Sequence, residues 1–389
     1  MAKQNKKAEI LEAAERIFSR KGSAAKIGDI GVEAGVTDSV IYHYFKNKND
    51  LMFSVLSERL KWELKRVDEH LKGIIDPASK LSKLIWLQLR YHDRHPDYAA
   101  LQLFECRSNR KFREHEAHRL TMEWAGYFNA PLAEGVSTGQ FDPDLDIQVA
   151  RDAVLGMLDM ENIFCLAAGE TENNLSDQEA IMDLILALLR APKKAVQQSC
   201  TKSEAIIRAA EKEISQKGFI NAKITHIAAR AGVSEGTIYE YFENKDALLF
   251  SVMENSIDKH IDVFDEAFSI KEPIRKLRRF IKLHFMLYCQ RPEFLNIFLT
   301  DGLFNRNFYK SQAYKRFRVY LEGLDRIMVQ GKMAGVIRAQ VSNRLFKNLF
   351  LGAFCHMTLR WQFAEPEKRF NMIGEIDSAV DLIVRSVSV

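Results

Sequence analysis

Apolar residues recur at i, i+3, i+4 and i+7 along almost the whole chain, and no segment shows the sustained alternation of a β-strand. A helix that ends at Gly22 has one apolar face, made of Ile10, Ala13, Ala14, Ile17 and Phe18. A longer stripe follows Lys48 and comprises Leu51, Val55, Leu56, Leu60, Leu64 and Val67. The pattern predicts an all-α protein.

Two dipeptides mark the starts of longer helices. Asp76-Pro77 has the composition of an N-cap followed by proline in the first turn, and Glu272-Pro273 stands at the matching place almost two hundred residues later. We therefore expect helices to begin at Pro77 and Pro273.

The chain is an internal duplication with a period near 196 residues. Residues 41–55 and 238–252 share ten of fifteen positions. The match continues far downstream, where the paired residues are Pro96 and Pro292, Asn109 and Asn305, Phe112 and Phe308, Gly135 and Gly331, Gly139 and Gly335, and Gly156 and Gly352. Such a long period indicates two tandem domains, named repeat 1 and repeat 2 here, and not a solenoid.

A polar segment at 191–201, APKKAVQQSCT, separates the two repeats and is typical of a linker. Each repeat divides further into a short N-terminal domain and a longer helical domain. The predicted domains are 1–47 and 48–190 in repeat 1, and 202–244 and 245–389 in repeat 2.

Each N-terminal domain contains two short helical patterns joined by a tight turn. The sequences are IGDIGVEAGVTDSVIYHYF in repeat 1 and ITHIAARAGVSEGTIYEYF in repeat 2. Gly35 or Gly232 can take a positive φ in the turn, and Thr37 or Ser234 can cap the next helix. This is the arrangement of a helix-turn-helix, whose second helix enters the major groove of DNA.

At these residues the sequence resembles the tetracycline-repressor (TetR) family of one-component regulators. Repeat 2 follows the family signature through Ile227, Ala228, Ala231, Gly232, Val233, Ser234, Gly236, Thr237, Ile238, Tyr239, Tyr241, Phe242, Lys245 and Leu248. Repeat 1 keeps Ala34, Gly35, Val36, Thr37, Ile41, Tyr42, Tyr44, Phe45, Lys48 and Leu51. It departs from the signature at Ser39 and Val40, where the family has Gly and Thr, so we expect repeat 2 to grip DNA more strongly.

The resemblance implies which side chains contact DNA. Phosphate contacts would come from Tyr42, Tyr44 and Lys48 in repeat 1 and from Thr237, Tyr239, Tyr241 and Lys245 in repeat 2. Base contacts would come from the first turn of each second helix, at Thr37, Asp38 and Ser39 and at Ser234, Glu235 and Gly236. The alternative for Tyr42 and Tyr239 is local packing.

The longer helical domains are expected to bind a ligand. Candidate lining residues are Trp86, Tyr91, Phe104, Trp124, Phe128 and Phe164 in repeat 1, and Phe280, His284, Tyr288, Phe298, Phe317 and Phe354 in repeat 2. Each of these could instead be an ordinary core residue. As a set, 25 Phe and 12 Met suit a large apolar effector.

Two segments, RPEFLNIFLTDGLFNRNFY and QGKMAGVIRAQ, look like those of family members that respond to fatty acids or acyl-coenzyme A thioesters. We therefore expect a lipid-like acyl effector, with aromatic or drug-like hydrophobes as the alternative.

Composition narrows the function classes. The 56 basic and 52 acidic residues give a net charge of only +4, so any nucleic-acid surface must be local. No run of 18 apolar residues and no signal peptide is present, which favours a cytoplasmic protein. The five scattered cysteines fit reduced thiols.

No enzyme, cofactor or metal site is predicted. A nucleophile elbow, a phosphate loop and a dinucleotide fingerprint are all absent. His115 and His118 in EHEAH are three residues apart, where a zinc-protease motif needs four.

The preferred hypothesis is thus a DNA-binding transcriptional regulator, and specifically a repressor that a hydrophobic effector releases. The competing hypothesis is a ligand-binding or interaction protein that keeps the fold with weak DNA binding. Two further expectations concern partners. Because the two reading turns differ, the operator should have two unlike half-sites. The last two helices of each repeat should pair within one chain as a pseudo-dimer.

Overall fold

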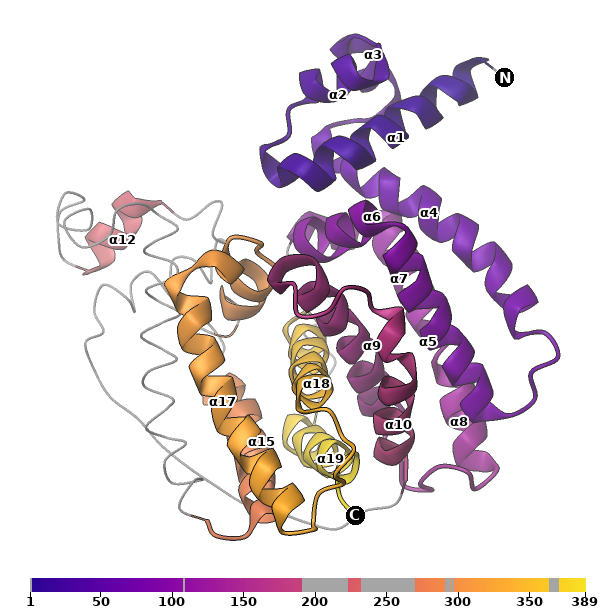
Figure 1. Cartoon of the computed structure of the whole chain (residues 1–389). Helices are drawn as coiled ribbons and strands as arrows, with labels where there is room; N and C mark the ends of the chain where they lie inside the picture. The colour runs from indigo at the N-terminus through magenta and orange to yellow at the C-terminus, as the bar shows by residue number, and fades with distance from the viewer. Residues whose placement is uncertain are drawn as a thin grey trace. The chain divides into compact units, whose positions relative to one another are not determined.

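In the computed structural model, every regular element of the described residues is a helix (Figure 1), apart from an isolated bridge between Ile337 and Ser388. The described residues are 2–107, 109–190, 223–231, 270–290, 295, 297–363 and 371–389. The prediction of an all-α protein is confirmed. No helix in these ranges is both long enough and apolar enough to cross a membrane.

Repeat 1 begins with three helices and a connecting turn: α1 (Ala2–Lys21), the 3₁₀ turn η1 (Gly22–Ala24), α2 (Ile27–Ala34) and α3 (Asp38–Tyr44). Its longer domain contains α4 (Lys48–Leu71), α5 (Pro77–Arg94), α6 (Pro96–Ala100), the π-helix η2 (Leu101–Cys106), η3 (Arg110–Glu114), α7 (Glu116–Gly126), α8 (Asn129–Ser137), α9 (Ile147–Ile163), the π-helix η4 (Phe164–Ala168), η5 (Leu175–Asp177) and α10 (Gln178–Leu188).

The described elements of repeat 2 follow the same order. They are α12 (Ile224–Ala231), α15 (Pro273–Gln290), the π-helix η6 (Phe298–Leu303), η7 (Phe308–Lys310), α17 (Gln312–Met333), α18 (Asn343–Phe363) and α19 (Met372–Arg385).

Helix ends follow the local sequence signals. Gly22 and Gly35 both have positive φ, at 53° and 62°, directly after α1 and α2. Asp76 caps α5, accepting from the backbone N–H of Ser79 at 2.7 Å, and Pro77 occupies the first turn. The predicted starts at Pro77 and Pro273 are confirmed.

Thr37 differs from its prediction. It stands at the N-cap position of α3, but its hydroxyl makes no capping hydrogen bond. The Oγ1 atom instead lies 2.9 Å from Oγ of Ser39. The two hydroxyls satisfy each other, which leaves the first backbone N–H groups of α3 without a side-chain cap from Thr37.

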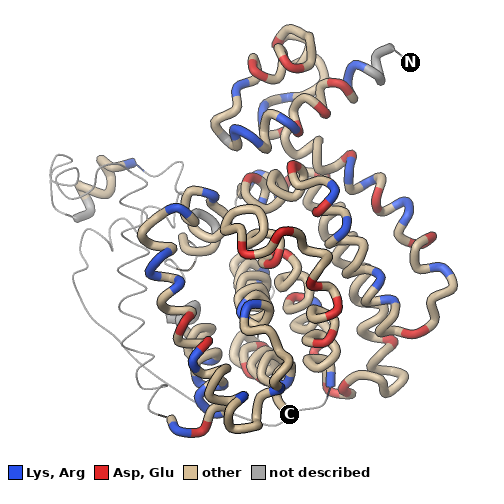
Figure 2. The backbone as a smooth tube through the Cα atoms, in the orientation of Figure 1, with Lys and Arg blue, Asp and Glu red and all other residues tan. Residues whose placement is uncertain are grey.

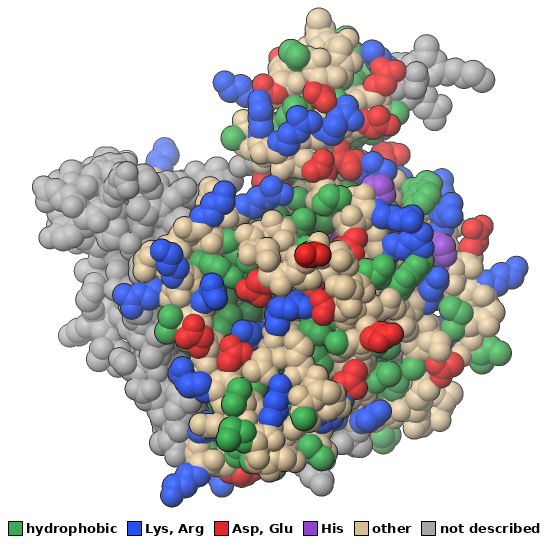
Figure 3. Space-filling view, in the orientation of Figure 1, with side chains coloured by type: hydrophobic (Ala, Val, Ile, Leu, Met, Phe, Trp, Pro, Cys, Tyr) green, Lys and Arg blue, Asp and Glu red, His purple; other side chains and the backbone are tan. Residues whose placement is uncertain are grey.

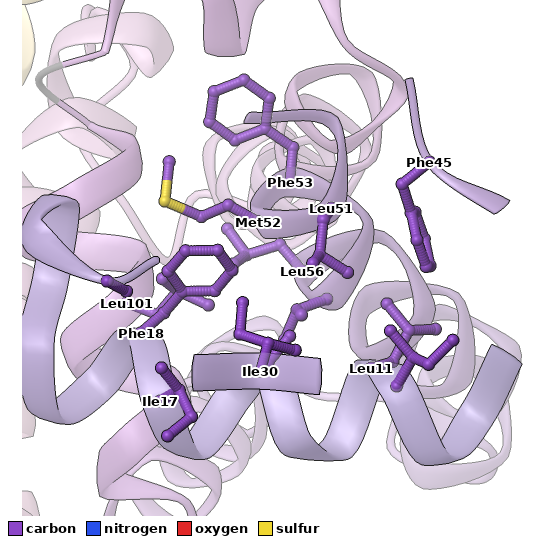
Figure 4. Close-up of a cluster of buried hydrophobic side chains, with 14 of the residues drawn as sticks. Leu11, Ile17, Phe18, Ile30, Phe45, Leu51, Met52, Phe53, Leu56 and Leu101 are labelled. Carbon is purple, nitrogen blue, oxygen red and sulfur yellow. The ribbon is translucent and has the colours of Figure 1, made fainter. Parts of the chain in front are cut away.

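The helix-turn-helix domain of repeat 1 is held by one apolar cluster (Figure 4). All five predicted apolar residues of α1 are buried, and they meet Ile30 of α2, Ile41 of α3 and Leu51 of α4. Leu101 and Cys106 of η2 belong to the same cluster. Burial of aliphatic and aromatic side chains is the main stabilising term in such a small domain, so α3 is held on a packed support.

Contacts divide the chain into two compact units, and the division does not follow the repeat boundary. Unit 1 comprises residues 1–143 and 158–179, and unit 2 comprises residues 144–157 and 180–389. Unit 2 therefore contains the first part of α9 and most of α10 from repeat 1 together with the described helices of repeat 2.

The matched glycines make matched contacts. A Cβ on Gly135 would collide with the ring of Phe141, and a Cβ on Gly331 would collide with the side chain of Ile337, six residues on in both repeats. Within unit 2, Gly156 of α9 packs directly on Gly352 of α18, and a Cβ on either one would collide with the backbone of the other. Glycine is needed there because the two backbones touch.

Candidate functional sites

The recognition helix α3 presents a mostly polar face to solvent. Thr37, Asp38 and Ser39 are exposed at its first turn, and Tyr42 is 51% exposed one turn further on. Ile41 is fully buried. This alternation leaves the predicted base-contacting residues and one predicted phosphate contact available to a DNA groove. It also disfavours the alternative of local packing for Tyr42.

The basic residues of α1 are mostly engaged within the domain. Arg16 donates to Glu33 at 2.8 Å, and Lys21 lies 3.0 Å from Asp29. These hydrogen bonds lower the pKa of both carboxyl groups. Figures 2 and 3 show Lys and Arg next to Asp and Glu on these three helices. A DNA surface must therefore be built from other side chains.

The turn after α3 supplies such side chains. Asn47 caps α4, accepting from the N–H of Asp50 at 3.0 Å, and Asp50 in turn accepts from the backbone N–H of Lys46 at 2.7 Å. Nε2 of His115 lies 3.3 Å from the other carboxylate oxygen of Asp50. These bonds fix the turn that carries Lys48, which is half-buried.

Two exposed residues at this surface were missed from the sequence. His43 and Lys46 are both exposed, on either side of the predicted contact Tyr44, which is half-buried. The sequence could have indicated both residues, because their side chains carry N–H donors and they lie close to the buried Phe45 in the chain. They extend the candidate phosphate-contacting surface toward α4.

The predicted DNA contacts of repeat 2 lie outside the described residues. These are Ser234, Glu235, Gly236, Thr237, Tyr239, Tyr241 and Lys245. The helix before them, α12, is described, and it buries Ile224, Ile227 and Ala228. It has the same length as α2 and the matching position in its repeat.

In the longer domain of repeat 1, polar side chains occupy a buried core. His92 of α5, Gln102 of η2 and Asn162 of α9 are each at least nine-tenths buried. Asp159, one turn before Asn162, forms an ion pair with Arg107. Within the described part of the chain, Nδ1 of His92, Oε1 of Gln102 and Oδ1 of Asn162 have no hydrogen-bond partner. We name these three residues with Asp159 the polar cluster.

Burial lowers the pKa of His92 below its usual value. The charge of Asp159 and the neighbouring side chains of Asn162 and Gln102 act in the opposite direction, but their effects on the pKa are smaller. His92 is therefore neutral near pH 7, and its ring can accept as well as donate a hydrogen bond.

The predicted lining residues of repeat 1 fall in different surroundings. Phe104, Phe128 and Phe164 are buried. Tyr91 is half-buried, and its ring lies 5.2 Å from that of Tyr98. Trp86 is half-buried with the cationic groups of Lys83 and Arg90 over its ring, at 3.9 and 4.5 Å.

The matching core of repeat 2 is aromatic. The ring centroid of His284 lies 4.2 Å from that of Phe354 and 4.8 Å from that of Phe350. Phe280 stacks on Tyr320 at 5.3 Å. Two other predicted lining residues, Phe298 and Phe317, form a further edge-to-face pair at 5.1 Å, and the side chain of Tyr288 is not among those described.

Among the described residues, each core has a side-chain hydrogen bond at the same place. Nδ1 of His284 lies 2.7 Å from the hydroxyl of Tyr320 in repeat 2. The residues 196 positions earlier are Gln88 and Trp124, and there the indole N–H donates to Oε1 of Gln88 at 3.1 Å. Both repeats thus have a hydrogen bond between the two equivalent helices, but the side chains that form it differ.

The family models that match this chain cover most of its length. The model for bacterial regulatory proteins of the tetR family matches residues 10–55 and again 206–252. A tetracyclin repressor-like C-terminal domain matches 75–160, and a YsiA-like C-terminal region matches 252–386.

Individual relatives are more distant. A fatty acid metabolism regulator protein from Bacillus subtilis is 25% identical over 158 residues, which are 40% of this chain and 81% of that protein. The repressor KstR2 from Mycolicibacterium smegmatis is 27% identical over 149 residues, 36% of this chain and 70% of that protein. Among solved structures, the regulator FadR from Bacillus subtilis in complex with stearoyl-CoA has a TM-score of 0.43 at 23% identity, covering 46% of this chain and 97% of that one.

The helix-turn-helix domain with its exposed second helix and the twofold match to the family's DNA-binding domain agree with one another. The chain belongs to the TetR family and is a DNA-binding transcriptional regulator with two tandem copies of the family's unit.

Proposed function

We propose that the chain is a repressor whose two helix-turn-helix domains bind one operator. Binding of a hydrophobic small molecule causes the repressor to dissociate from the operator. The observation that carries the proposal is the exposed polar face of α3 on an apolar three-helix support. A helix held in this way can enter a major groove without reorganising its own domain.

In this proposal, Thr37, Asp38 and Ser39 approach base edges, while Tyr42, Tyr44 and Lys48 contact phosphates. In repeat 2 the residues that approach base edges are Ser234, Glu235 and Gly236. The residues that contact phosphates are Thr237, Tyr239, Tyr241 and Lys245. Because the reading turns of the two repeats differ, the preferred operator has two unlike half-sites. An ordinary homodimer reads a palindrome, since its symmetry requires it.

Repeat 2 is the proposed site of the effector. Its buried wall of phenylalanines around Phe350 and Phe354 suits a long hydrocarbon chain, because such a wall requires no polar partner from the ligand. The relative named as a fatty acid metabolism regulator supports a fatty acid or acyl-coenzyme A thioester as the class of effector.

In repeat 1, the π-helix η2 could transmit a change in the core to the DNA-binding domain. Gln102 belongs to the polar cluster, whereas Leu101 and Cys106 on the same short helix pack in the core of the helix-turn-helix domain. The side chain of Glu105 also touches Gly22 at the end of α1. A ligand that favours one position of η2 would favour one position of α1 and α3.

The two repeats are proposed to pair within one chain. Gly156 and Gly352 are equivalent residues, and they contact each other in unit 2. A residue that touches its own equivalent is the signature of a two-fold axis. A tether also keeps the partner at an effective concentration near millimolar, which favours pairing within the chain over pairing between chains.

Selection of bound DNA from a random pool tests the reading of the operator. We expect an asymmetric site that binds at least about 10³ times more tightly than random DNA. Tyr239→Ala should weaken binding more than Tyr42→Ala, and both should act about equally on every sequence, as lost phosphate contacts do. A perfectly palindromic selected site, or equal losses from the two substitutions, would contradict the division of roles.

Addition of oleoyl-coenzyme A to the operator complex tests the effector. We expect dissociation of the complex at concentrations where free coenzyme A has no effect. Lipid extracted from the purified protein and identified by mass spectrometry gives a second measurement, and recovery of polar metabolites alone would remove the lipid effector.

One observation favours a second candidate, a ligand-binding protein with weak DNA affinity. In repeat 1 the hydroxyls of Thr37 and Ser39 are turned toward each other, and the acidic Asp38 is exposed beside them. A salt series on the chain's own upstream DNA separates the two candidates. Specific binding keeps its advantage over random DNA, whereas the second candidate shows none.

A further inference from the structure

Two ion pairs in unit 2 join residues of different repeats, and in both the acid belongs to repeat 1 and the base to repeat 2. The first is buried. Nε of Arg360 in α18 donates to Asp152 of α9 at 2.6 Å, and the two side chains are 14% and 6% exposed. Glu375 of α19 holds the other side of the same guanidinium, with Oε2 2.7 Å from Nη2. Arg360 is thereby fixed in one orientation toward repeat 1.

The second ion pair joins α10 to Arg338, which lies in the loop between α17 and α18. Nη1 of Arg338 lies 2.7 and 2.6 Å from the two carboxylate oxygens of Asp183 in α10. Nη2 of the same residue donates to the carbonyl oxygen of Ser386 at 2.6 Å, just after α19. Arg338 is thus held by its own repeat while it reaches the other one.

We infer that these charges make repeat 1 select repeat 2 as its partner and reject a second copy of itself. The acidic members, Asp152 and Asp183, both stand on repeat 1, and the basic members, Arg338 and Arg360, both stand on repeat 2. The inference rests on the proposed pairing of the repeats about Gly156 and Gly352, and it adds the reason why unlike repeats pair.

Pairing of repeat 1 with another repeat 1 would lose both ion pairs. The residue that matches Arg360 in repeat 1 is Phe164, and the residue that matches Arg338 is Asp142. A buried Asp152 would then face an aromatic ring, and Asp183 would face another aspartate. Asp152 would keep only the longer contact with Arg151 of its own repeat, at 3.3 Å, and the half-exposed Asp183 would meet a like charge, so both places would be less favourable than in the unlike pair.

Pairing of repeat 2 with another repeat 2 would lose the buried ion pair. The residue that matches Asp152 is Asn348, which is neutral. The aspartate of α19 that aligns with Asp183 is Asp381, and Arg278 of its own repeat already holds it in an ion pair. Only the unlike pair therefore gives each arginine a carboxylate in the other repeat, which is specificity through the cost of the wrong partners.

The experiment cuts the linker between the repeats and measures which halves then pair with each other. A specific protease site is placed within 191–201 of the full chain, the folded protein is cut there, and ¹⁵N-labelled and unlabelled samples are mixed. Urea is raised until pairs of mixed isotope composition appear in native mass spectra, which proves that halves exchange. Random choice would give unlike pairs in about the same total amount as like pairs. We expect unlike pairs to exceed that ratio by at least about tenfold, which corresponds to about 1.4 kcal/mol.

The double variant Asp152→Asn with Asp183→Ala should remove most of this preference, bringing the ratio to within about threefold of random choice. Glu179→Ala is the matched control, because it removes an exposed acid from the same helix α10, and it should leave the preference unchanged. Like pairs in random proportion from the unsubstituted halves would overturn the inference, as would an unchanged preference in the double variant.

Light scattering on the intact chain separates this inference from the pairing on which it rests. A mass near 44.8 kDa supports pairing within the chain. Twice that mass for the intact chain would contradict the proposed pseudo-dimer itself. A single-chain mass together with random sorting of the cut halves would contradict only the role of the charges.

Discussion

The buried core of repeat 1 and the matching core of repeat 2 occupy equivalent helices and have opposite chemistry. Repeat 1 has the polar cluster of His92, Gln102, Asp159 and Asn162. In the sequence of repeat 2 the same positions are occupied by Tyr288, Phe298, Cys355 and Thr358. Around them, repeat 2 adds a network of phenylalanine rings that repeat 1 lacks at the equivalent Leu84, Val154 and Leu158.

The supporting backbone has changed much less. Both repeats carry a π-helix at the same place, both turn at a glycine of positive φ, Gly139 and Gly335, and both close that turn on a second glycine, Gly135 and Gly331. The difference teaches that a glycine packed closely against its neighbours tolerates no larger residue, whereas the side chains that line a core can change.

The largest expected effect on stability comes from disrupting the contact between Gly156 and Gly352. Gly156→Ala places a methyl group against the backbone of Gly352, and backbone cannot move aside as a flexible side chain can. We expect a loss of about 2–3 kcal/mol in the free energy of unfolding, measured with urea. Gly126→Ala is the control, because nothing lies within 4 Å of a Cβ there and alanine favours the helix. Equal stability of the two variants would show that the glycine contact is not a constraint.

The second effect concerns where a hydrocarbon chain binds. A photoreactive diazirine analogue of a fatty acid should label peptides of α15, α17 and α18 at least about tenfold more than peptides of α5 and α9. Each methylene buried among phenylalanines gains about 0.8 kcal/mol. In repeat 1 the same chain would lie against the polar side chains of His92, Gln102 and Asn162, which offer hydrocarbon a less favourable surface than phenylalanine does. Equal labelling of both repeats would contradict the expectation that the hydrocarbon chain binds in repeat 2.

Most of the helical frame could be predicted from the sequence because its signals are local. Gly22, Gly35 and Asp76 act on backbone groups within a few residues, and the apolar stripe of α4 is buried as its period requires. The mixed composition of unit 2 could not be predicted in this way. It depends on contacts between residues such as Gly156 and Gly352, which lie 196 positions apart.

The candidate sites were predictable to different extents. The exposed face of α3 follows from a helical period with Ile41 inside, so Thr37, Asp38, Ser39 and Tyr42 could be named in advance. The polar cluster was missed, because His92, Gln102 and Asn162 come from three separate elements. Each polar residue by itself is typical of a protein surface. Trp86 stays a prediction, and the sequence did not indicate that its partly exposed ring lies between two cations.

A third effect compares the hydrogen bond that the two cores share. Tyr320→Phe removes the hydroxyl beside Nδ1 of His284 in a buried place, and we expect a loss of about 1–3 kcal/mol in the free energy of unfolding. Gln88→Met removes the acceptor of the Trp124 indole N–H. Because Trp124 is partly exposed, water can replace that acceptor, and we expect a loss below about 1 kcal/mol. The reverse order would show that the repeat 1 bond is the more important one.

The smallest effect is a pH dependence that only the polar cluster of repeat 1 should show through His92. Because burial lowers the pKa of His92 in the folded chain, the unfolded chain binds a proton first as pH falls through about 6.5. This contribution to stability is present above that pH and is lost below it, by at most about 1.4 kcal/mol per pH unit. Urea unfolding at pH 7.5 and 5.5 should therefore show a smaller difference in His92→Gln than in the unsubstituted chain, whereas His43→Gln, on the exposed face of α3, should leave the difference unchanged. A larger acid sensitivity in His92→Gln would mean that Asp159 holds the folded imidazole in its protonated form, and that repeat 1 buries a charged pair where the sequence of repeat 2 has the neutral Tyr288 and Cys355.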